Sequence, residues 1–181
     1  MSIYMELMSS DYIELAKQFR VNPKHCDNPE HYQNYIWQES ISDHKQGMGV
    51  THVFVDENDE TKEKKIAGYI TLRSSSLIMD SGESYKLGFP ALEISELAVD
   101  CNYEGKNLGT DMVKFAISEA IRLNEDAIGI QYVILCADPK AVGFYTKKSV
   151  GFRKLLSTYQ QIPRERRNKN CTPMYLKVAS Y

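Results

Sequence analysis

The chain has 181 residues, which is enough for one domain and short for two. Its 22 basic and 24 acidic side chains nearly cancel, so the composition offers no overall field that would attract nucleic acid or an anionic membrane. The first residues lack the basic start and apolar stretch of a secretion signal, and no apolar run approaches the roughly 18 residues that cross a bilayer. We therefore expect a single domain over residues 1–181, in the cytoplasm and without a membrane partner.

The N-terminal part predicts a strand and two helices. Residues 2–8 alternate weakly, as a strand does. Asp11 and Glu14 form a capping box, which predicts a helix that ends at Asn22-Pro23. Asn28-Pro29 predicts a second helix, because it supplies an N-cap followed by a proline at the first helical position.

A β-hairpin is expected next. Residues 51–55 and 66–72 read as its strands, and the charged stretch 56–65 reads as the exposed loop between them. Residues 74–90 are polar and contain glycine, so we expect an irregular excursion there before the next strand.

The following segment alternates strands and helices. A strand over 91–99 precedes an amphipathic helix over 108–123 and a short, almost wholly apolar strand over 131–136. Asp138-Pro139 then starts a short helix, and Gly151-Phe152 leads into another strand. This order predicts a mixed class with one strand–helix–strand crossover at its centre.

A last strand is expected over 174–178, after a loop over 160–173. This loop contains one acidic residue, Glu165, and four basic residues: Arg164, Arg166, Arg167 and Lys169. The loop reads either as a solvated charge run or as a contact for phosphate or carboxylate groups of a substrate, and both readings stay open.

The cysteines and histidines show no metal-binding pattern. The four cysteines lie far apart, without a C-x-x-C pair, at Cys26, Cys101, Cys136 and Cys171. We expect free thiols in a reducing compartment, acting as small apolar side chains. The four histidines lack the spacing of metal ligands, so surface histidines and no metal site are expected.

Residues 93–110 read as a buried strand, a tight loop with Gly105 and Gly109, and the first turn of a helix. The N–H groups of a helical first turn have no partner within the helix, so several of them point at one spot. Such a spot binds phosphate, although an ordinary strand-to-helix turn has the same pattern.

Five short segments are informative through their order and spacing along the chain. They are Leu97-Ala-Val, Glu104-Gly-Lys-Asn-Leu-Gly, Cys136-Ala-Asp, Phe144-Tyr145 and Gly151-Phe152. Together they resemble the GNAT superfamily of acyl-coenzyme A-dependent N-acyltransferases. The resemblance implies an α+β (mixed α/β) fold, in which a twisted, mixed, mainly antiparallel sheet carries helices on both faces. It also implies a central β-α-β unit that binds coenzyme A, with acetyl-CoA as the cosubstrate.

The resemblance also implies which residues would bind acetyl-CoA. The backbone of residues 97–99 would splay from the neighbouring strand and pair with the pantetheine arm, as a peptide adds to a sheet edge. The pyrophosphate loop falls on residues 104–110. The full implied set is Leu97, Ala98, Val99, Glu104, Gly105, Lys106, Asn107, Leu108, Gly109, Thr110, Asp138, Ala141, Phe144 and Tyr145.

Two positions of the loop depart from the family pattern. Glu104 places a carboxylate where a basic or amide side chain is usual, which is unfavourable beside an anionic ligand unless the side chain points to solvent. Asn107 replaces a glycine, but asparagine tolerates left-handed backbone better than other residues, so the turn can survive. These departures weaken the expectation of tight binding more than that of the fold.

Three residues are the catalytic candidates. Glu93 matches the general-base glutamate of the histone-acetylating members, and Glu96 would face the opposite side of the strand. Each is open to a purely structural role in an ion pair or at a solvated strand end. Tyr145 matches the tyrosine that the resemblance places beside the thioester sulfur, where a neutral phenol can donate to the leaving thiolate. Its alternative is a core tyrosine beside Phe144.

Three functions stay open. The first is transfer of an acetyl group to a primary amine of a small molecule or peptide, by direct attack in a ternary complex. The second is a toxin-like activity on aminoacyl-tRNA, because residues around Ile128 and Tyr145 are similar to that branch; otherwise a nucleic-acid partner is not expected. The third is a noncatalytic acyl-CoA sensor or partner-binding module. A homodimer through the last strands is also open.

Overall fold

The computed structural model describes residues 2–80, 86–156, 159–161 and 170–178. Its contacts divide the chain into two units, residues 1–73 with 95–112 and residues 74–94 with 113–181. Three long elements contribute to both units: β3 (Lys64–Asp80), β4 (Lys86–Val99) and α4 (Leu108–Asp126). The single domain expected over residues 1–181 stays a prediction.

The first unit contains the expected hairpin, in the strand order β1-β2-β3-β4. β1 (Ser2–Leu7) pairs antiparallel with β2 (Val50–Glu57), and β2 pairs antiparallel with β3. The hairpin strands extend further into the charged segment than predicted, because Glu57 lies opposite Lys64, with 3.5 Å between Oε2 and Nζ. Opposite charges facing each other across two strands stabilise the ladder.

Short helices precede β2 in the same unit. A 3-10 turn, η1 (Ser10–Tyr12), leads into α1 (Ile13–Ala16), and α2 (Pro29–Gln38) and α3 (Ser40–Lys45) follow. The start of α2 is confirmed, since the Asn28 side chain accepts the His31 N–H at 3.3 Å. The predicted capping box is wrong: no side chain caps η1 or α1, and Glu14 instead pairs with Lys17.

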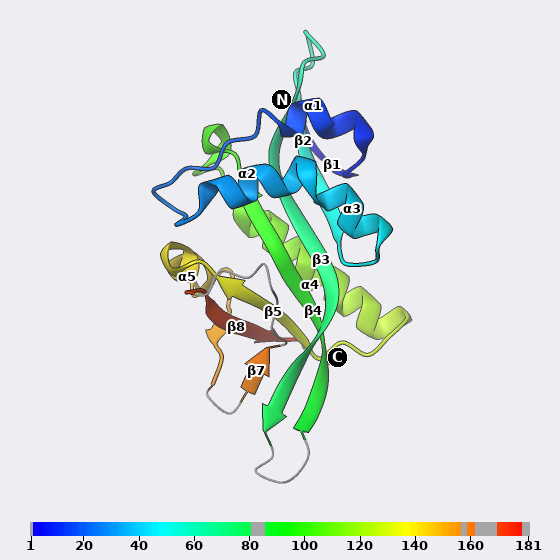
Figure 1. Ribbon diagram of the computed structural model, residues 1–181, viewed down its shortest axis with the longest axis vertical. Helices are drawn as coiled ribbons and strands as arrows, with labels where there is room; N and C mark the ends of the chain where they lie inside the picture. The colour runs from blue at the N-terminus through cyan, green and yellow to red at the C-terminus, as the bar shows by residue number, and fades with distance from the viewer. Residues whose placement is uncertain (1, 81–85, 157–158, 162–169, 179–181) are drawn as a thin grey trace. The chain divides into compact units, whose positions relative to one another are not determined.

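The core of the first unit lies between these helices and the hairpin, and α1, α2 and α3 cover one face of β2 and β3 in Figure 1. Its buried residues are Met8, Ala16, Phe19, Tyr35, Ile36, Val53, Val55, Ile66, Tyr69 and Ala98. The close approach of β3 to β4 requires Gly68, because a Cβ there would lie 3.0 Å from the carbonyl oxygen of Ala98. The packing therefore fixes the strand segment that the family resemblance assigns to the pantetheine arm.

The second unit has the strand order β3-β4-β5-β8-β6, and β7 pairs with the end of β3. β4 and β5 (Tyr132–Ala137) run parallel, whereas β8 (Thr172–Lys177) is antiparallel to both β5 and β6 (Arg153–Lys154). The mixed, mainly antiparallel sheet is thus confirmed.

The excursion expected over residues 74–90 is wrong, because β3 runs to Asp80 and β4 begins at Lys86. The extension of β3 is held by β7 (Tyr159–Gln161), with Leu77 opposite Gln161. Leu77 is almost fully buried in a small cluster with Ala91 and Ile134. Pairing with a segment about 80 residues further along the chain, rather than local preference, makes this stretch a strand.

The helices of the second unit follow the sequence closely. α4 continues three residues past the predicted end at 123, and Val113, Ala116 and Ala120 on its apolar face are fully buried. A 3-10 turn, η3 (Pro139–Ala141), leads into α5 (Val142–Tyr145), after the expected Asp138-Pro139 start.

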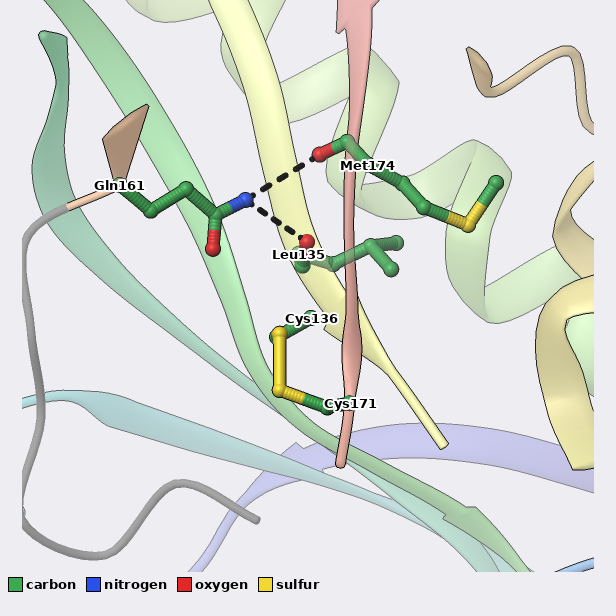
Figure 2. Close-up of a disulfide and its surroundings, with 5 residues drawn as sticks. All are labelled: Leu135, Cys136, Gln161, Cys171 and Met174. Atoms are coloured by element: carbon green, nitrogen blue, oxygen red, sulfur yellow. Dashed lines mark hydrogen bonds between the residues drawn. A yellow bond between two sulfur atoms is a disulfide. The ribbon is translucent and has the colours of Figure 1, made fainter. Parts of the chain in front are cut away.

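Figure 2 shows a disulfide between Cys136 and Cys171, with a Cα–Cα distance of 5.4 Å. The expectation of four free thiols is wrong for this pair, whereas Cys26 and Cys101 are in no disulfide. The cause is the β5–β8 register, which sets Cys136 opposite Pro173, two residues after Cys171. That places the two Cα atoms within the range that a disulfide spans.

No helix among the described residues is long and apolar enough to span a membrane. The cytoplasmic location stays a prediction.

Candidate active site

The predicted phosphate loop lies in the first unit, between β4 and α4. Asp100 caps a 3-10 turn, η2 (Cys101–Tyr103), by accepting the Asn102 N–H at 3.0 Å. The backbone then turns through left-handed conformations at Gly105, with φ of +75°, and at Asn107, with φ of +63°. α4 begins at the next residue, and its first-turn N–H groups have no partner within the helix. The loop thus has the backbone form that binds a phosphate.

Asn107 keeps the turn that the family builds with glycine. We expect Asn107→Ala to lower the free energy of unfolding by about 1 kcal/mol, because an asparagine side chain offsets the cost of left-handed backbone by local hydrogen bonding and alanine cannot. Asn107→Gly should leave it within about 0.5 kcal/mol, because glycine accepts this conformation. Urea unfolding of the two variants is the measurement. Equal losses in both would show that the asparagine side chain, and not its φ angle, matters.

The Glu104 carboxylate has two side-chain partners in the same unit. Its Oε2 accepts the Asn22 Nδ2–H at 2.9 Å and lies 3.7 Å from Nε2 of His25. A bonded carboxylate of this kind has a defined orientation, so the departure at Glu104 is accommodated. Neighbouring Cys101 is a poor nucleophile, because desolvation and the carboxylates of Asp100 and Glu104 raise the pKa of its thiol.

The ladder between β4 and β5 ends before β4 does. Ala91 to Ile94 pair with Tyr132 to Leu135, whereas β4 continues as a strand to Val99. Within the described part of the chain, no residue of β4 after Ile94 belongs to this parallel ladder. This is the feature that an added pantetheine arm requires along residues 97–99.

Glu96 lies on this last part of β4 and has an imidazole partner. Its Oε2 is 3.0 Å from Nε2 of His31, on the first turn of α2. Burial and, next, the charge of Glu96 raise the pKa of the Tyr69 phenol well above its ordinary value. Burial also raises the pKa of Tyr35 to about 12, and its hydroxyl donates to Asp43 at 3.3 Å. His31 was expected as a surface histidine, and this expectation is wrong.

Glu93 lies in the second unit and is 1% exposed. It is opposite Ile134 in the β4–β5 ladder. A carboxylate buried in a sheet core is costly to place there, so its presence has a specific cause, either structural or catalytic.

Tyr145 closes α5 in the second unit and is 7% exposed. Its ring packs edge to face against Phe144 at 4.8 Å and Phe152 at 5.9 Å between centroids. The Phe152 N–H donates to the Tyr145 carbonyl at 3.1 Å, which joins α5 to the segment before β6. Asp138 caps η3 by accepting the Lys140 N–H at 3.0 Å, so its side chain serves the turn that starts this helix. The phenol is therefore in a rigid, aromatic setting.

The predicted residues fall into two groups. The first unit holds Glu96 and residues 97–110, and the second holds Glu93, Asp138, Ala141 and residues 144–145. The described residues contain no cluster of three or more side chains that could hold a metal ion.

A model of the acetyltransferase (GNAT) family matches residues 10–152 of the chain. The chain belongs to the GNAT acetyltransferase family. As a member of that family, this acetyltransferase uses acetyl-CoA as its acyl donor. No curated protein matches it.

Solved structures share the fold of this acetyltransferase over almost its whole length. A Tyr-to-Phe mutant of KacT has a TM-score of 0.73 and 16% identity, covering 98% of this chain and 96% of its own. A Tyr-to-Phe mutant of the AtaT toxin has a TM-score of 0.73 and 18% identity, covering 97% and 89%. AtaT complexed with acetyl-methionyl-tRNAfMet has a TM-score of 0.70 and 18% identity, covering 97% and 95%.

Two further residues of the acetyltransferase carry no clear sequence signal. His31 meets Glu96 across 65 positions of the chain, which no local pattern reveals. Gln161 is buried, and its Nε2 donates to the carbonyls of Leu135 at 2.8 Å and Met174 at 3.3 Å, as Figure 2 shows. The polar character of residues 160–173 pointed to a loop, but Gln161 lies in β7 and joins it to β5 and β8. Residues 162–169, with the four basic residues discussed above, lie outside the described residues.

Proposed function

We propose that the chain transfers the acetyl group of acetyl-CoA directly to a primary amine and that Tyr145 protonates the leaving sulfur. The C–N bond forms and the C–S bond breaks, while the amine loses a proton and the thiolate gains one. The observation that carries the proposal is the setting of Tyr145, a phenol fixed at the end of α5 between Phe144 and Phe152. A phenol is protonated at neutral pH and can donate as negative charge grows on sulfur. The Tyr-to-Phe mutants of two similar structures support the choice of a tyrosine.

The first unit supplies the cofactor-binding part of the proposal. Leu97, Ala98 and Val99 offer backbone groups where the β4–β5 ladder has ended, and residues 104–110 offer the turn before α4. Acetyl-CoA supplies the activated thioester; these residues would hold its pantetheine arm and pyrophosphate. In the second unit, Asp138, Ala141 and Phe144 would position α5 and its tyrosine.

The acceptor we propose first is the amine of an aminoacyl-tRNA. Charge is unevenly divided: the first unit has nine basic and sixteen acidic residues, and the second has thirteen and eight. Between residues 127 and 181 there are ten basic residues and only two acidic ones. A strong charge asymmetry within a chain favours a polyanionic partner even when the total is near zero. The AtaT complex with acetyl-methionyl-tRNAfMet supports this acceptor.

A small-molecule or peptide amine is the second candidate. The formal charge of −2 and the isoelectric point near 6.1 favour it, since neither gives the whole chain a long-range attraction for RNA. The two candidates differ in how they respond to salt.

The test is a thiol-release assay with acetyl-CoA and either a pool of aminoacyl-tRNAs or a panel of small amines. With tRNA as acceptor, kcat/KM should fall steeply with salt, with a logarithmic slope of about −0.7 to −0.9 for each phosphate contact. Removing the exposed lysines beside Tyr145, in Lys147→Ala/Lys148→Ala, should make this slope less steep, whereas Lys24→Ala in the acidic unit should not. Turnover of small amines alone, insensitive to salt, would reject the tRNA acceptor. Binding of acetyl-CoA without any turnover would reject the transferase and support a sensor.

A further inference from the structure

The first unit brings together two titratable side chains that the reaction above does not yet use. Nε2 of His31 lies 3.0 Å from Oε2 of Glu96, although 65 residues separate them in the chain. The imidazole is 24% exposed and the carboxylate 10% exposed. The pair is therefore shielded enough to interact strongly and open enough to exchange a proton.

Aromatic side chains fix the orientation of the imidazole. Its ring packs edge to face on Tyr32, at 5.1 Å between centroids, and lies tilted against Tyr35 at 6.4 Å. Tyr35 in turn stacks on Tyr69, whose hydroxyl donates to the Tyr32 carbonyl at 2.8 Å. An imidazole held by a carboxylate and by packed rings is pre-organised for proton transfer, because little side-chain freedom is lost when it reacts.

The titratable groups that face the pair come from α2, β3 and β4. Besides Glu96 they are the phenols of Tyr32, Tyr35 and Tyr69, which are neutral at physiological pH. Burial holds the pKa of both Tyr35 and Tyr69 above the ordinary value, with smaller contributions from the charges of Asp43 and then Glu96 at Tyr35 and of Glu96 at Tyr69. Imidazole is the side chain that proteins most often use as a base near neutral pH.

The position of Glu96 connects the pair to the reaction. It immediately precedes residues 97–99, which lie beyond the end of the β4–β5 ladder and are proposed to hold the pantetheine arm. An acceptor amine must lose a proton in forming an amide, and an amine like that of lysine is about 1 in 2,500 neutral at pH 7. A base near the start of this segment would meet that need.

We propose that His31 and Glu96 act as one base that takes the proton from the acceptor amine. This inference rests on the proposed acetyl transfer. The N–H bond of the acceptor ammonium breaks first, and its proton passes to the imidazole of His31. The neutral amine then attacks, so that the C–N bond forms and the C–S bond breaks, while the leaving sulfur takes the Tyr145 proton and the second amine proton goes to solvent. Glu96 orients the imidazole and balances the charge of the imidazolium, the role that a buried carboxylate has beside a catalytic histidine. Solvent removes the proton after product release.

The test uses two acceptors of matched shape, ethylamine and O-methylhydroxylamine, because the second is already neutral at pH 7. In His31→Gln and in Glu96→Gln, kcat with ethylamine should fall by about 10²–10³-fold. With O-methylhydroxylamine the fall should stay below about tenfold. The double variant should lose little more than either single one, since residues that act as a unit are not additive. His44→Gln, which changes an exposed histidine on α3, is the matched control and should keep wild-type rates.

Two further measurements separate a catalytic from a structural role. The affinity for acetyl-CoA and the thermal midpoint of His31→Gln should match the wild type within error. Added imidazole should restore part of the ethylamine activity of His31→Ala, because it can replace the missing base. Equal losses with both acceptors, or wild-type rates in both single variants, would overturn the base. A wild-type protein that turns over neither these two amines nor aminoacyl-tRNA would overturn the proposed transferase itself, and the base with it.

Discussion

Replacing Tyr145 with phenylalanine is expected to lower kcat by about 10²–10⁴-fold, the usual contribution of a positioned general acid. The loss should appear in kcat and leave the KM for acetyl-CoA nearly unchanged, because the hydroxyl acts on charge that develops only in the transition state. The fold should survive, since the ring keeps its packing against Phe144 and Phe152. Steady-state thiol release over a range of acetyl-CoA concentrations is the measurement.

Tyr175→Phe is the matched control. Tyr175 also lies in the second unit, in β8, where its ring packs on Tyr132 at 6.0 Å between centroids. It is not among the residues assigned to the cofactor or the reaction. Removing its hydroxyl should leave the rate within about twofold of the wild type, because a conservative substitution away from the reacting groups has a small effect. An unchanged rate in Tyr145→Phe would remove this residue as the acid, whereas a loss in both variants would point to the packing of the second unit.

Loss of the disulfide is expected to destabilise the oxidised protein by about 3–4 kcal/mol. Cys136 and Cys171 are 35 positions apart, and the estimate follows from the loop-closure entropy that this cross-link removes from the unfolded chain. For a chain of this length the midpoint of thermal unfolding should fall by roughly 6–16 °C. The change can be made by Cys136→Ser/Cys171→Ser or by adding dithiothreitol to the wild type, and followed by circular dichroism.

The two routes should agree, and dithiothreitol should have no effect on the double serine variant. Cys101→Ser is the control, because Cys101 is a free and exposed thiol and its replacement should leave the midpoint unchanged. If dithiothreitol and the double variant both left the midpoint unchanged, the cross-link would contribute nothing to the stability of the second unit. The β5–β8 ladder and the Gln161 amide would then be sufficient to hold these strands.

Most individual elements could be predicted because their signals are local. Asn28-Pro29 starts α2 through a cap within four residues, and the apolar period of residues 108–123 gives α4. The alternation of residues 51–55 gives β2, whose buried residues are Thr51, Val53 and Val55. In each case the signal that predicts the element lies within it, as a cap or as the spacing of its apolar side chains.

Two of the wrong predictions have the opposite cause, which is a partner from a distant segment of the chain. Residues 74–76 are three serines, and the segment 74–80 becomes a strand because Leu77 is buried and pairs with β7. Cys136 and Cys171 form a disulfide because the register of β5 and β8 brings the two residues close together. The expected capping box failed for a different, local reason, since Glu14 pairs with Lys17 one turn away. A pattern read from neighbours in sequence has no information about which distant segment supplies a partner.

The candidate site divides in the same way. The sequence by itself carried the family resemblance and the turn before α4, because both depend on residue types at short spacing, and the resemblance in turn predicts the phosphate loop and the role of Tyr145. Only the tertiary structure decided that the β4–β5 ladder ends at Ile94, that Glu104 is tied to Asn22, and that Glu96 meets His31. Strand register and the packing of a helix on a sheet set these contacts, and both depend on the balance of burial and hydrogen bonding over the whole unit.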